Sequence, residues 1–460
     1  MGSKRQNIQL ELAFMTEGRG ESPRAVTEGT EVPVAKHDTE RPAEATAYLM
    51  EEVCQRENLR KALKRVKKNK GSPGVDGMTV RQLSGYLCEH WSTIRDQLLR
   101  GTYKPQPVKR VEIPKPGGGA RELGIPTVLD RFIQQAILQV LQKRWDSTFS
   151  ESSYGFRPGR SAHQAVAQAQ TYIAEGYNWV VDIDLEKFFD RVNHDMLMGR
   201  VAKRVSDKRL LKLIRAFLNA GVMEDGLVSP TDEGTPQGGL LSPLLSNLVL
   251  DDLDRELEKR GHRFVRYADD CNIYVRSERA GQRVMESIAC FITKKLKLKV
   301  NGCKSAVDRP WRREFLGFSF TAGREPKRRI SPQAVRQFKE HIRELTPRSG
   351  RWSIEQICEH LTCYLLGWRG YFGFCQTPSV LRSLDSWIRR RLRSVVWKQW
   401  KRGRTRYAEL RKRNVGKRLA AQTAGSCHGP WRIARSPALS FALPTAYFTS
   451  VGLPKLAPGR

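Results

Sequence analysis

The chain has 460 residues, of which 39% are hydrophobic, and its 81 Lys and Arg outweigh 48 Asp and Glu to give a net charge of +33. This length and apolar content allow several domains with their own cores and exclude a wholly disordered protein. A compact chain with this excess of positive charge repels itself unless a polyanion covers part of it, so the composition predicts a nucleic-acid partner. Residues 321–420 alone hold 25 basic and 7 acidic residues, which indicates a localised basic surface.

Other features exclude further classes of protein. No apolar run approaches the roughly 18 to 20 residues that a membrane span requires, and no signal pattern is found, so we expect a cytoplasmic protein without a membrane partner. The nine cysteines are scattered and form no C-x-x-C pair, which argues against a disulfide framework or a cysteine-based zinc module. Residues 1–47 are polar and lack apolar periodicity, which predicts a mobile leader.

Apolar spacing predicts helices and strands from residue 48 onward. The expected helices cover 49–66, 130–146, 161–176, 208–220 and 240–258. The expected strands cover 108–113, 123–125, 179–185 and the two arms of a hairpin over 264–275. Beyond residue 326 the pattern is mainly helical, and five prolines in the last forty residues predict short elements and loops.

Three carboxylates fall where this pattern brings strands together. Asp184 lies at the end of the apolar strand 179–185, and Asp269 and Asp270 lie in the turn of the hairpin 264–275. Adjacent carboxylates at neutral pH require cations. Mg²⁺ prefers oxygen ligands and is usually shared with substrate phosphates, so the cluster suits two ions about 3.5 to 4 Å apart that support nucleotidyl transfer. A lone Asp-Asp pair is more often only a turn, so the surrounding motifs decide between the two interpretations.

Ordered motifs around these carboxylates resemble those of the reverse transcriptase family. They are V-D-I-D-L-E-K-F-F-D at 181–190, T-P-Q-G-G-L-L-S-P at 235–243, Y-A-D-D at 267–270, L-K-L-K-V-N-G-C-K-S at 296–305 and F-L-G-F at 315–318. The flanking segments resemble group II intron-encoded proteins in particular. They are K-N-K-G-S-P-G-V-D-G at 68–77, I-P-K-P-G-G-G-A-R-E-L-G-I-P-T at 113–127, S-Y-G-F-R-P-G-R-S-A-H at 153–163 and G-W-R-G-Y-F at 367–372.

The resemblance covers about residues 48–450 and implies an α+β fold. Fingers and a palm with an antiparallel sheet, as in a right-hand polymerase, are expected over 48–325, and an α-helical thumb and maturase domain over 326–420. Residues 421–460 are expected to form a short tail of the DNA-binding kind. The segment G-P-W-R-I-A-R-S-P at 429–437 resembles endonuclease-lacking bacterial members of class C, since no HNH motif follows residue 420.

Matched position by position, the resemblance also implies the roles of the acidic and aromatic residues. The implied metal ligands, for two Mg²⁺ ions, are the catalytic carboxylates of Asp184, Asp269 and Asp270 and the backbone carbonyl of Leu185. Phe189, five residues after the first aspartate, corresponds to the steric gate that favours deoxynucleotides. We expect Asp182 to face the other side of its strand, away from these ligands.

Four further residues match positions that contact the incoming nucleotide. Lys115 and Arg121 lie at the tip of the hairpin formed by 108–125 and would hold the triphosphate through charge-assisted hydrogen bonds. Gln237 lies in a glycine-containing loop that lets backbone approach the nucleotide. Lys304 matches a residue proposed to protonate the departing pyrophosphate. The alternatives are an ordinary solvated hairpin for the first pair and a surface lysine for Lys304.

The C-terminal helical part has one apolar stripe with basic residues on its other faces. The stripe consists of Leu381, Leu384, Ile388, Leu392 and Val395. We expect phosphates to be contacted by Arg389, Arg390, Arg391, Arg393 and Lys398. A solvated helix face is the alternative interpretation.

The primary hypothesis is an RNA-directed DNA polymerase and maturase that assists splicing of its own intron RNA and copies that RNA into DNA at a target site. Its expected partners are group II intron RNA, target DNA with a primer and deoxynucleoside triphosphates, with a homodimer as a further candidate, in a bacterial ribonucleoprotein or nucleoid. Two alternatives stay open. One is a splicing-only RNA-binding factor, which the intact aspartates argue against. The other is a domesticated reverse transcriptase in repair or defence.

Overall fold

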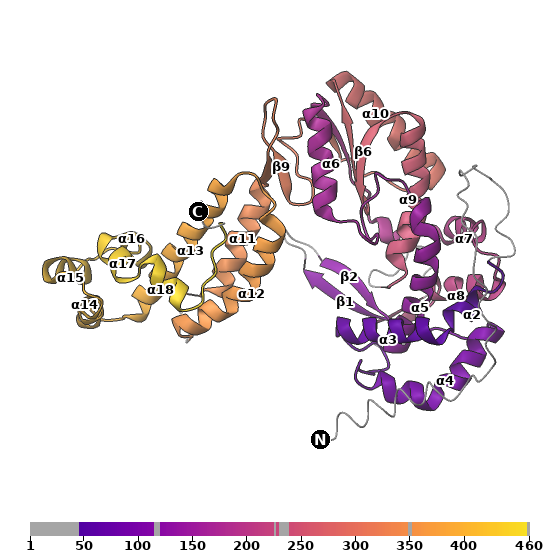
Figure 1. Cartoon of the computed structure of the whole chain (residues 1–460), viewed down its shortest axis with the longest axis horizontal. Coiled ribbons are helices and arrows are strands. Elements are labelled where there is room, and N and C mark those ends of the chain that lie inside the picture. Colours follow the sequence, from indigo (N-terminus) through magenta and orange to yellow (C-terminus); the bar gives the residue numbers. More distant parts are fainter. Residues whose placement is uncertain (1–45, 115–119, 225–226, 230–238, 348–351, 458–460) are drawn as a thin grey trace, which may run out of the picture. The chain divides into compact units, whose positions relative to one another are not determined.

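A computed structural model describes residues 46–114, 120–224, 227–229, 239–347 and 352–457 (Figure 1). The chain divides into two compact units. The first consists of the described parts of 1–161, 181–273 and 282–306, and the second of those of 162–180, 274–281 and 307–460. Most of the predicted leader lies outside the described residues, as do Lys115 and Gln237.

Helices make up much of the first unit. They are α2 (Leu49–Val53), α3 (Arg56–Asn69), α4 (Leu83–Arg100), α5 (Val128–Trp145), α7 (His194–Ala202), α8 (Lys208–Leu218), α9 (Ser242–Lys259) and most of α10 (Glu278–Phe291). Short helical turns follow at η1 (Asp146–Thr148), η2 (Phe188–Asp190) and η3 (Ile292–Leu296). The single helix predicted over 49–66 is two helices, because Gln55 takes an extended conformation between α2 and α3.

The predicted hairpin near residue 115 is confirmed. Strand β1 (Val108–Pro114) pairs antiparallel with β2 (Ala120–Ile125), and Ile113 lies opposite Arg121. Strand β1 also pairs in parallel with β4 (Val222–Glu224), which pairs antiparallel with β5 (Leu227–Ser229). The sheet order is therefore β2-β1-β4-β5. The sequence does not predict β4 and β5, because three residues are too few to show alternation.

A second four-stranded sheet carries the predicted catalytic turn. Its strands are β3 (Trp179–Ile183), β6 (Arg263–Tyr267), β7 (Asp270–Val275) and β8 (Ala306–Asp308), in the order β6-β7-β3-β8. Strands β6 and β7 are the arms of the predicted hairpin, and their apolar residues Phe264, Val265 and Ile273 are buried. Helix α9 contacts β6. Burial of these apolar side chains thus fixes the orientation of the hairpin in the sheet.

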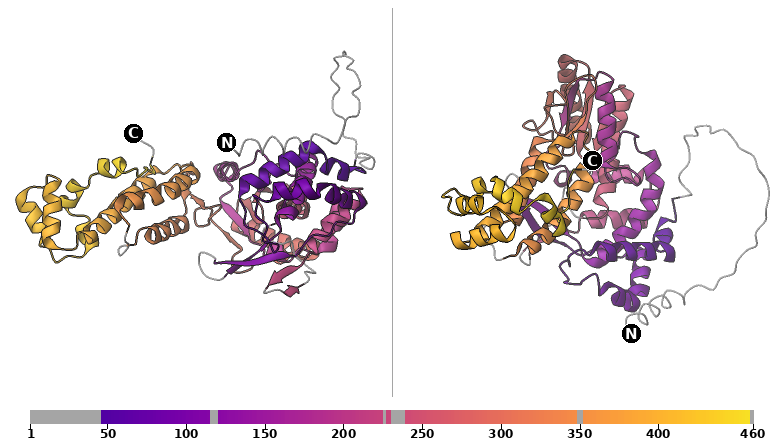
Figure 2. Two further views of the ribbon diagram at one scale, coloured as in Figure 1. Left: turned by 90° about the horizontal axis from the view of Figure 1, so that it is seen from below. Right: turned by 60° about the vertical axis from the view of Figure 1, so that its left-hand side comes forward.

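The second unit is mainly helical. Its elements are α6 (Ala162–Ala174), β9 (Phe318–Phe320), β10 (Arg328–Ile330), α11 (Pro332–Leu345), α12 (Ile354–Phe372), α13 (Pro378–Gln399), α14 (Gly403–Lys412), α15 (Lys417–Ala424), α16 (Pro430–Ile433), α17 (Pro437–Ala442) and α18 (Thr445–Ser450). Strands β9 and β10 pair antiparallel. Figure 2 shows α11, α12 and α13, in orange, as neighbouring helices. Among the described residues, no helix combines the length and the apolar character needed to cross a membrane.

One apolar core joins the helices α11 to α13 with the C-terminal segment. Phe338, Leu361 and Leu392 share this core with Leu439 and Leu456, and all five are buried. The carboxylate of Asp385 on α13 accepts hydrogen bonds from the N–H groups of Leu456 and Ala457, at 2.9 and 3.1 Å. Residues 421–457 therefore pack into the same core as the three long helices.

Candidate active site

The three predicted catalytic carboxylates stand on neighbouring strands of one sheet. Asp184 directly follows β3, Asp269 lies in the turn between β6 and β7, and Asp270 is the first residue of β7, the neighbour of β3. Ala268, just before the two aspartates, has a φ of 57°, in the left-handed region that few residues other than glycine adopt. The turn is therefore strained at the point where it presents the carboxylates.

Asp270 lies at the centre of a strongly acidic cluster. It reaches the solvent, but desolvation by the surrounding protein, followed by the charges of Asp269, Asp182 and Asp184, raises the pKa of Asp270 to about 7. The structure thus brings the three predicted carboxylates close enough to repel one another. Such an arrangement favours a bound cation over three free anions.

Asp182 belongs to this cluster, so the prediction that it faces away is wrong. Residues two apart along a strand point to the same side, and Asp182 lies two residues before Asp184. Asp182 is half-buried, and its charge helps to raise the pKa of Asp270. The site therefore has a fourth carboxylate beside the three that the family resemblance implies.

Hydrogen bonds to the segment after α10 hold Asp184 in place. The N–H of Asp184 donates to Ser305 Oγ at 3.0 Å, and the N–H of Asn301 donates to the carbonyl of Asp184 at 2.8 Å. Leu185 pairs with Val300 in an antiparallel bridge. These hydrogen bonds use the carbonyl of Asp184 and not that of Leu185, and the ligand role of the Leu185 carbonyl stays a prediction.

Lys304 lies at the edge of the acidic cluster. Its Nζ is 3.7 Å from Oδ2 of Asp184, and its side chain is 70% exposed. The positive charge of Lys304 lowers the pKa of Asp270 and so partly offsets the repulsion among the carboxylates. The structure thus places a solvent-accessible ammonium group beside the predicted metal ligands.

Phe189 follows the catalytic strand in the short helical turn η2. Lys187, with a φ of 48°, turns the chain just before it. Phe188 is buried, and its ring lies 5.2 Å from the ring of Phe189 in an edge-to-face arrangement. Phe189 itself is half-buried. The buried neighbour therefore anchors the turn, while the ring of Phe189 keeps a surface that a nucleotide can reach.

Of the other predicted nucleotide-binding residues, Arg121 has its backbone in β2, and its side chain is outside the described part of the chain. Lys115 and Gln237 lie outside it altogether. The roles of these three residues stay predictions.

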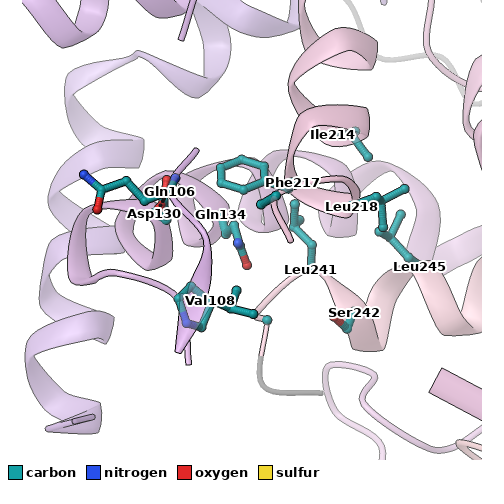
Figure 3. A pocket seen from close by; sticks show the side chains of 13 residues that line it. Gln106, Val108, Asp130, Gln134, Ile214, Phe217, Leu218, Leu241, Ser242 and Leu245 are labelled. Atoms are coloured by element: carbon teal, nitrogen blue, oxygen red, sulfur yellow. Dashed lines mark hydrogen bonds between the residues drawn. The ribbon is translucent and has the colours of Figure 1, made fainter. Parts of the chain in front are cut away.

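Gln134 on α5 is a residue that sequence reasoning misses. Its Oε1 accepts a hydrogen bond from the N–H of Leu240 at 2.9 Å, where the T-P-Q-G-G-L-L segment enters α9. Figure 3 shows Gln134 and Asp130 of α5 in a pocket that Phe217 of α8 and Leu241 also line. A glutamine next to the apolar residues Ile133 and Ile137 of α5 is the sequence signal that points to it. Gln134 fixes the end of the segment that is predicted to contact the nucleotide.

The carboxylate cluster fits a divalent cation by the chemistry of its donors. Among the described residues, no group of three or more His, Cys, Asp or Glu side chains is arranged so that it could hold a metal ion. Mg²⁺ at phosphoryl-transfer sites is usually held by one or two carboxylates together with waters and substrate phosphates, so a complete protein set is not required. The neighbouring carboxylates supply the negative charge and the hard oxygen donors that such an ion needs, while desolvation, followed by their mutual repulsion, raises the pKa of Asp270.

Three of the five predicted phosphate-binding cations on α13 instead contact other helices. Arg391 donates to the carbonyl and the hydroxyl of Thr346, which ends α11. Arg393 donates to the carbonyl of Leu443, which ends α17. Arg390 donates to the carbonyl of Trp431 in α16 and lies over its ring. These arginines are half-buried and satisfy carbonyls that helices leave without partners at their C-terminal ends.

The remaining two cations are freer to meet a ligand. Nη2 of Arg389 donates a hydrogen bond to Ser386 Oγ, on the same helix, at 3.2 Å. Lys398 is exposed near the end of α13. The prediction of RNA contacts therefore rests on Arg389 and Lys398 more than on their three neighbours.

Helix α3 presents a second basic surface, in the first unit. Leu59, Ala62 and Val66 are buried on one side of the helix. The other sides expose Arg56, Arg60, Lys61, Lys64, Arg65, Lys67 and Lys68. Glu57 is the one acidic residue of the helix. The sequence pattern ends the predicted helix at residue 66, whereas the structure continues α3 to Asn69.

Two family models match the chain. Residues 113–320 match "Reverse transcriptase (RNA-dependent DNA polymerase)", and residues 335–414 match "Group II intron, maturase-specific domain". The first match contains the acidic cluster, and the second contains α12 and α13. The fold and the site thus define a reverse transcriptase domain followed by a maturase-specific domain. These two matches confirm the resemblance to group II intron-encoded reverse transcriptases with a maturase domain.

Individual proteins show the same similarity. Protein YkfC of Escherichia coli is 40% identical over 218 residues, which are 46% of this chain and 57% of that protein. Group II intron-encoded protein LtrA of Lactococcus lactis is 38% identical over 188 residues, which are 41% of this chain and 31% of that protein. A solved chain titled "Partial Cas6-RT-Cas1--Cas2 complex" is 26% identical with a TM-score of 0.35, covering 54% of this chain and 43% of that one. The matched stretches span between 31% and 57% of these proteins.

The raised pKa of Asp270 makes cation binding depend on pH. In the metal-free protein this carboxyl stays protonated up to about pH 7, so the folded state loses stability as the pH rises from about 4 through 7 and Asp270 ionises. We therefore expect Mg²⁺ to raise the melting temperature more at pH 8 than at pH 6, where a proton competes for the site. Thermal unfolding with and without Mg²⁺ measures this. An equal shift at both pH values would contradict it.

Proposed function

We propose that the chain is an RNA-directed DNA polymerase and maturase of a mobile group II intron. It binds its own intron RNA, assists splicing and copies the RNA into DNA from a primer at a DNA target. The observation that carries the proposal is the acidic cluster of Asp184, Asp269 and Asp270 within a matched reverse transcriptase domain. Fingers and palm are assigned to 48–325, thumb and maturase helices to 326–420, and the tail to 421–460.

The chemistry assigned to the site is transfer of a nucleotide to a primer hydroxyl. Two Mg²⁺ ions held by Asp184, Asp269 and Asp270 would supply activation of that hydroxyl and stabilisation of the leaving pyrophosphate. Lys304, whose Nζ lies 3.7 Å from Oδ2 of Asp184, would neutralise or protonate the pyrophosphate. The ring of Phe189 excludes a nucleotide 2′-hydroxyl.

The fingertip and loop residues complete this assignment. Lys115 and Arg121 would hold the triphosphate, because phosphate oxygens form strong charge-assisted hydrogen bonds with cations. Gln237 would contact the incoming nucleotide from the loop whose far end Gln134 fixes.

Two basic surfaces support binding of intron RNA. The exposed side of α3 carries seven Lys and Arg residues with one acidic residue in the helix. On α13, Arg389 and Lys398 are placed to meet phosphates. Neither surface includes the carboxylate cluster, so RNA binding and DNA synthesis are assigned to different residues. We place the protein in a bacterial cytoplasm, in a ribonucleoprotein that reaches the nucleoid.

A steric-gate substitution tests the polymerase assignment. If the ring of Phe189 excludes the 2′-hydroxyl, then Phe189→Val is expected to increase incorporation of ribonucleotides relative to deoxynucleotides by about tenfold to a hundredfold on an RNA template. Competition between the two nucleotide types in primer extension measures this ratio. Phe441→Val, at an exposed phenylalanine of α17, is the matched control and should leave the ratio unchanged. An unchanged ratio in Phe189→Val, with synthesis retained, would remove Phe189 from the nucleotide site.

A further inference from the structure

Arg266 of β6 is buried next to the catalytic turn, and all five of its guanidinium N–H donors have acceptors. Its Nε and Nη2 donate to the two carboxylate oxygens of Asp254 at 2.7 and 2.6 Å. The second Nη2 donor reaches Ser153 Oγ at 2.8 Å. The two Nη1 donors reach Asn247 Oδ1 at 3.0 Å and the carbonyl of Ala268 at 2.8 Å. One side chain therefore joins helix α9, the segment around residue 153 and the turn itself.

The segment around residue 153 is also fastened to this strand by its backbone. The N–H of Tyr154 donates to the carbonyl of Arg266, and the N–H of Arg266 donates to the carbonyl of Ser152, both at 2.9 Å. The Nδ2 of Asn247 donates to the carbonyl of Gly155, also at 2.9 Å. Asn247 thus holds Arg266 with its oxygen and the neighbouring segment with its nitrogen.

Gly155 lies directly against the turn at Ala268. A Cβ at this position would lie 2.3 Å from the backbone nitrogen of Ala268, which is far inside van der Waals contact. Because residue 155 has no side chain, this segment can lie directly on the peptide group between Tyr267 and Ala268. The left-handed conformation of Ala268 is held at its nitrogen by this contact and at its carbonyl by the hydrogen bond from Arg266.

A buried Arg-Asp pair of this kind is poorly explained by stability alone. Burying two charges costs their solvation free energy, and their mutual attraction offsets this cost only when the geometry is good. Proteins in which apolar side chains replace such a pair are often as stable as the original. The pair instead holds the surrounding segments in a fixed position. The five donors of a guanidinium lie in one rigid plane, so all of them are satisfied only when the acceptors take up one particular arrangement. A strained turn persists only where its surroundings determine it, as they do here.

We propose that Arg266 is a positioning residue that fixes the turn carrying Asp269 and Asp270 against α9 and the 153–155 segment, so that the metal-binding carboxylates are placed before substrate arrives. Helix α9 begins at Ser242, directly after the segment predicted to contact the nucleotide (Figure 1). Through α9, the network therefore links the end of the segment predicted to contact the nucleotide to the metal-binding turn. This inference rests on the proposed polymerase function.

The experiment compares two Gly-to-Ala variants of the full chain. In Gly155→Ala the added methyl group must push the turn at Ala268, whereas Gly199→Ala in α7 adds a methyl group with nothing within 4 Å. For Gly155→Ala we expect kcat to fall by about tenfold to a hundredfold and the Mg²⁺ concentration for half-maximal synthesis to rise, with primer–template affinity unchanged. The Mg²⁺-induced rise in melting temperature should shrink in the same variant. Gly199→Ala should match the wild type in every measurement.

Ser153→Ala keeps the proposal testable if Gly155→Ala does not fold. It removes one acceptor of Arg266 and adds no bulk, so the same changes should appear at a few-fold size. A folded Gly155→Ala or Ser153→Ala with wild-type kcat and Mg²⁺ dependence would overturn the inference, as would an equal loss of primer–template affinity. Wild-type protein without synthesis would instead overturn the proposed function, while the Mg²⁺ effect on melting would still report on the turn.

Discussion

Asp269→Asn is expected to reduce DNA synthesis by about a thousandfold or more while leaving RNA affinity within about twofold of the wild type. Lewis-acid stabilisation by bound metal is worth several kcal/mol, and each 1.36 kcal/mol corresponds to a factor of ten in rate, so loss of about 4 kcal/mol gives this effect. The substitution keeps the size of the side chain and removes its charge. Primer extension on an RNA template and filter binding of the same RNA measure the two quantities.

DNA synthesis and RNA affinity should respond differently because of where the basic residues lie. The exposed cations of α3 and α13 are remote in sequence from the turn that carries Asp269. Asp195→Asn is the matched control, because Asp195 is 82% exposed on α7 and pairs with Arg215 rather than with the acidic cluster. If a folded Asp269→Asn protein lost RNA affinity in step with synthesis, the division of roles would be wrong.

Simultaneous replacement of Arg390, Arg391 and Arg393 by Ala is expected to destabilise the helical part of the second unit. Each guanidinium satisfies a carbonyl of a neighbouring helix, and a hydrogen bond from a charged donor contributes about 1.5 to 3 kcal/mol, so the loss should amount to several kcal/mol in the free energy of unfolding. Thermal or urea unfolding of the full chain measures this. Arg382→Ala, at an exposed position of the same helix, is the matched control and should melt with the wild type.

The two remaining cations of α13 should behave differently. Arg389→Gln with Lys398→Gln should keep the melting temperature and lower the dependence of RNA affinity on salt, by about 0.7 to 0.9 in the logarithmic slope for each phosphate that the variant no longer neutralises. A triple variant that melts with the wild type but binds RNA weakly would show that Arg390, Arg391 and Arg393 face the RNA after all.

The acidic cluster can be predicted from the sequence because its geometry is local. A strand that ends in an aspartate and a tight hairpin turn with two more are recognisable from alternation and turn residues alone. The prediction for Asp182 is wrong because it misapplies the same rule, since alternation puts Asp182 and Asp184 on one side. The short strands β4 and β5 carry too few residues to reveal any period.

The residues that support the site depend on contacts across the fold. The sequence shows Arg266 in an apolar strand, but only the structure brings Asp254, Asn247 and Ser153 to its five donors. Likewise, nothing along α13 indicates that Arg391 meets the end of α11. A basic residue on a helix is therefore assigned to nucleic acid or to a helix terminus only when its neighbours are known.

Extension of a DNA primer on an RNA template by the wild-type chain, with deoxynucleotides and with or without Mg²⁺, tests the central claim most directly. The proposed function predicts template-length DNA with Mg²⁺, none when the ion is chelated, and none from Asp269→Asn. Tight RNA binding without any extension would contradict the claim and favour an RNA-binding splicing factor.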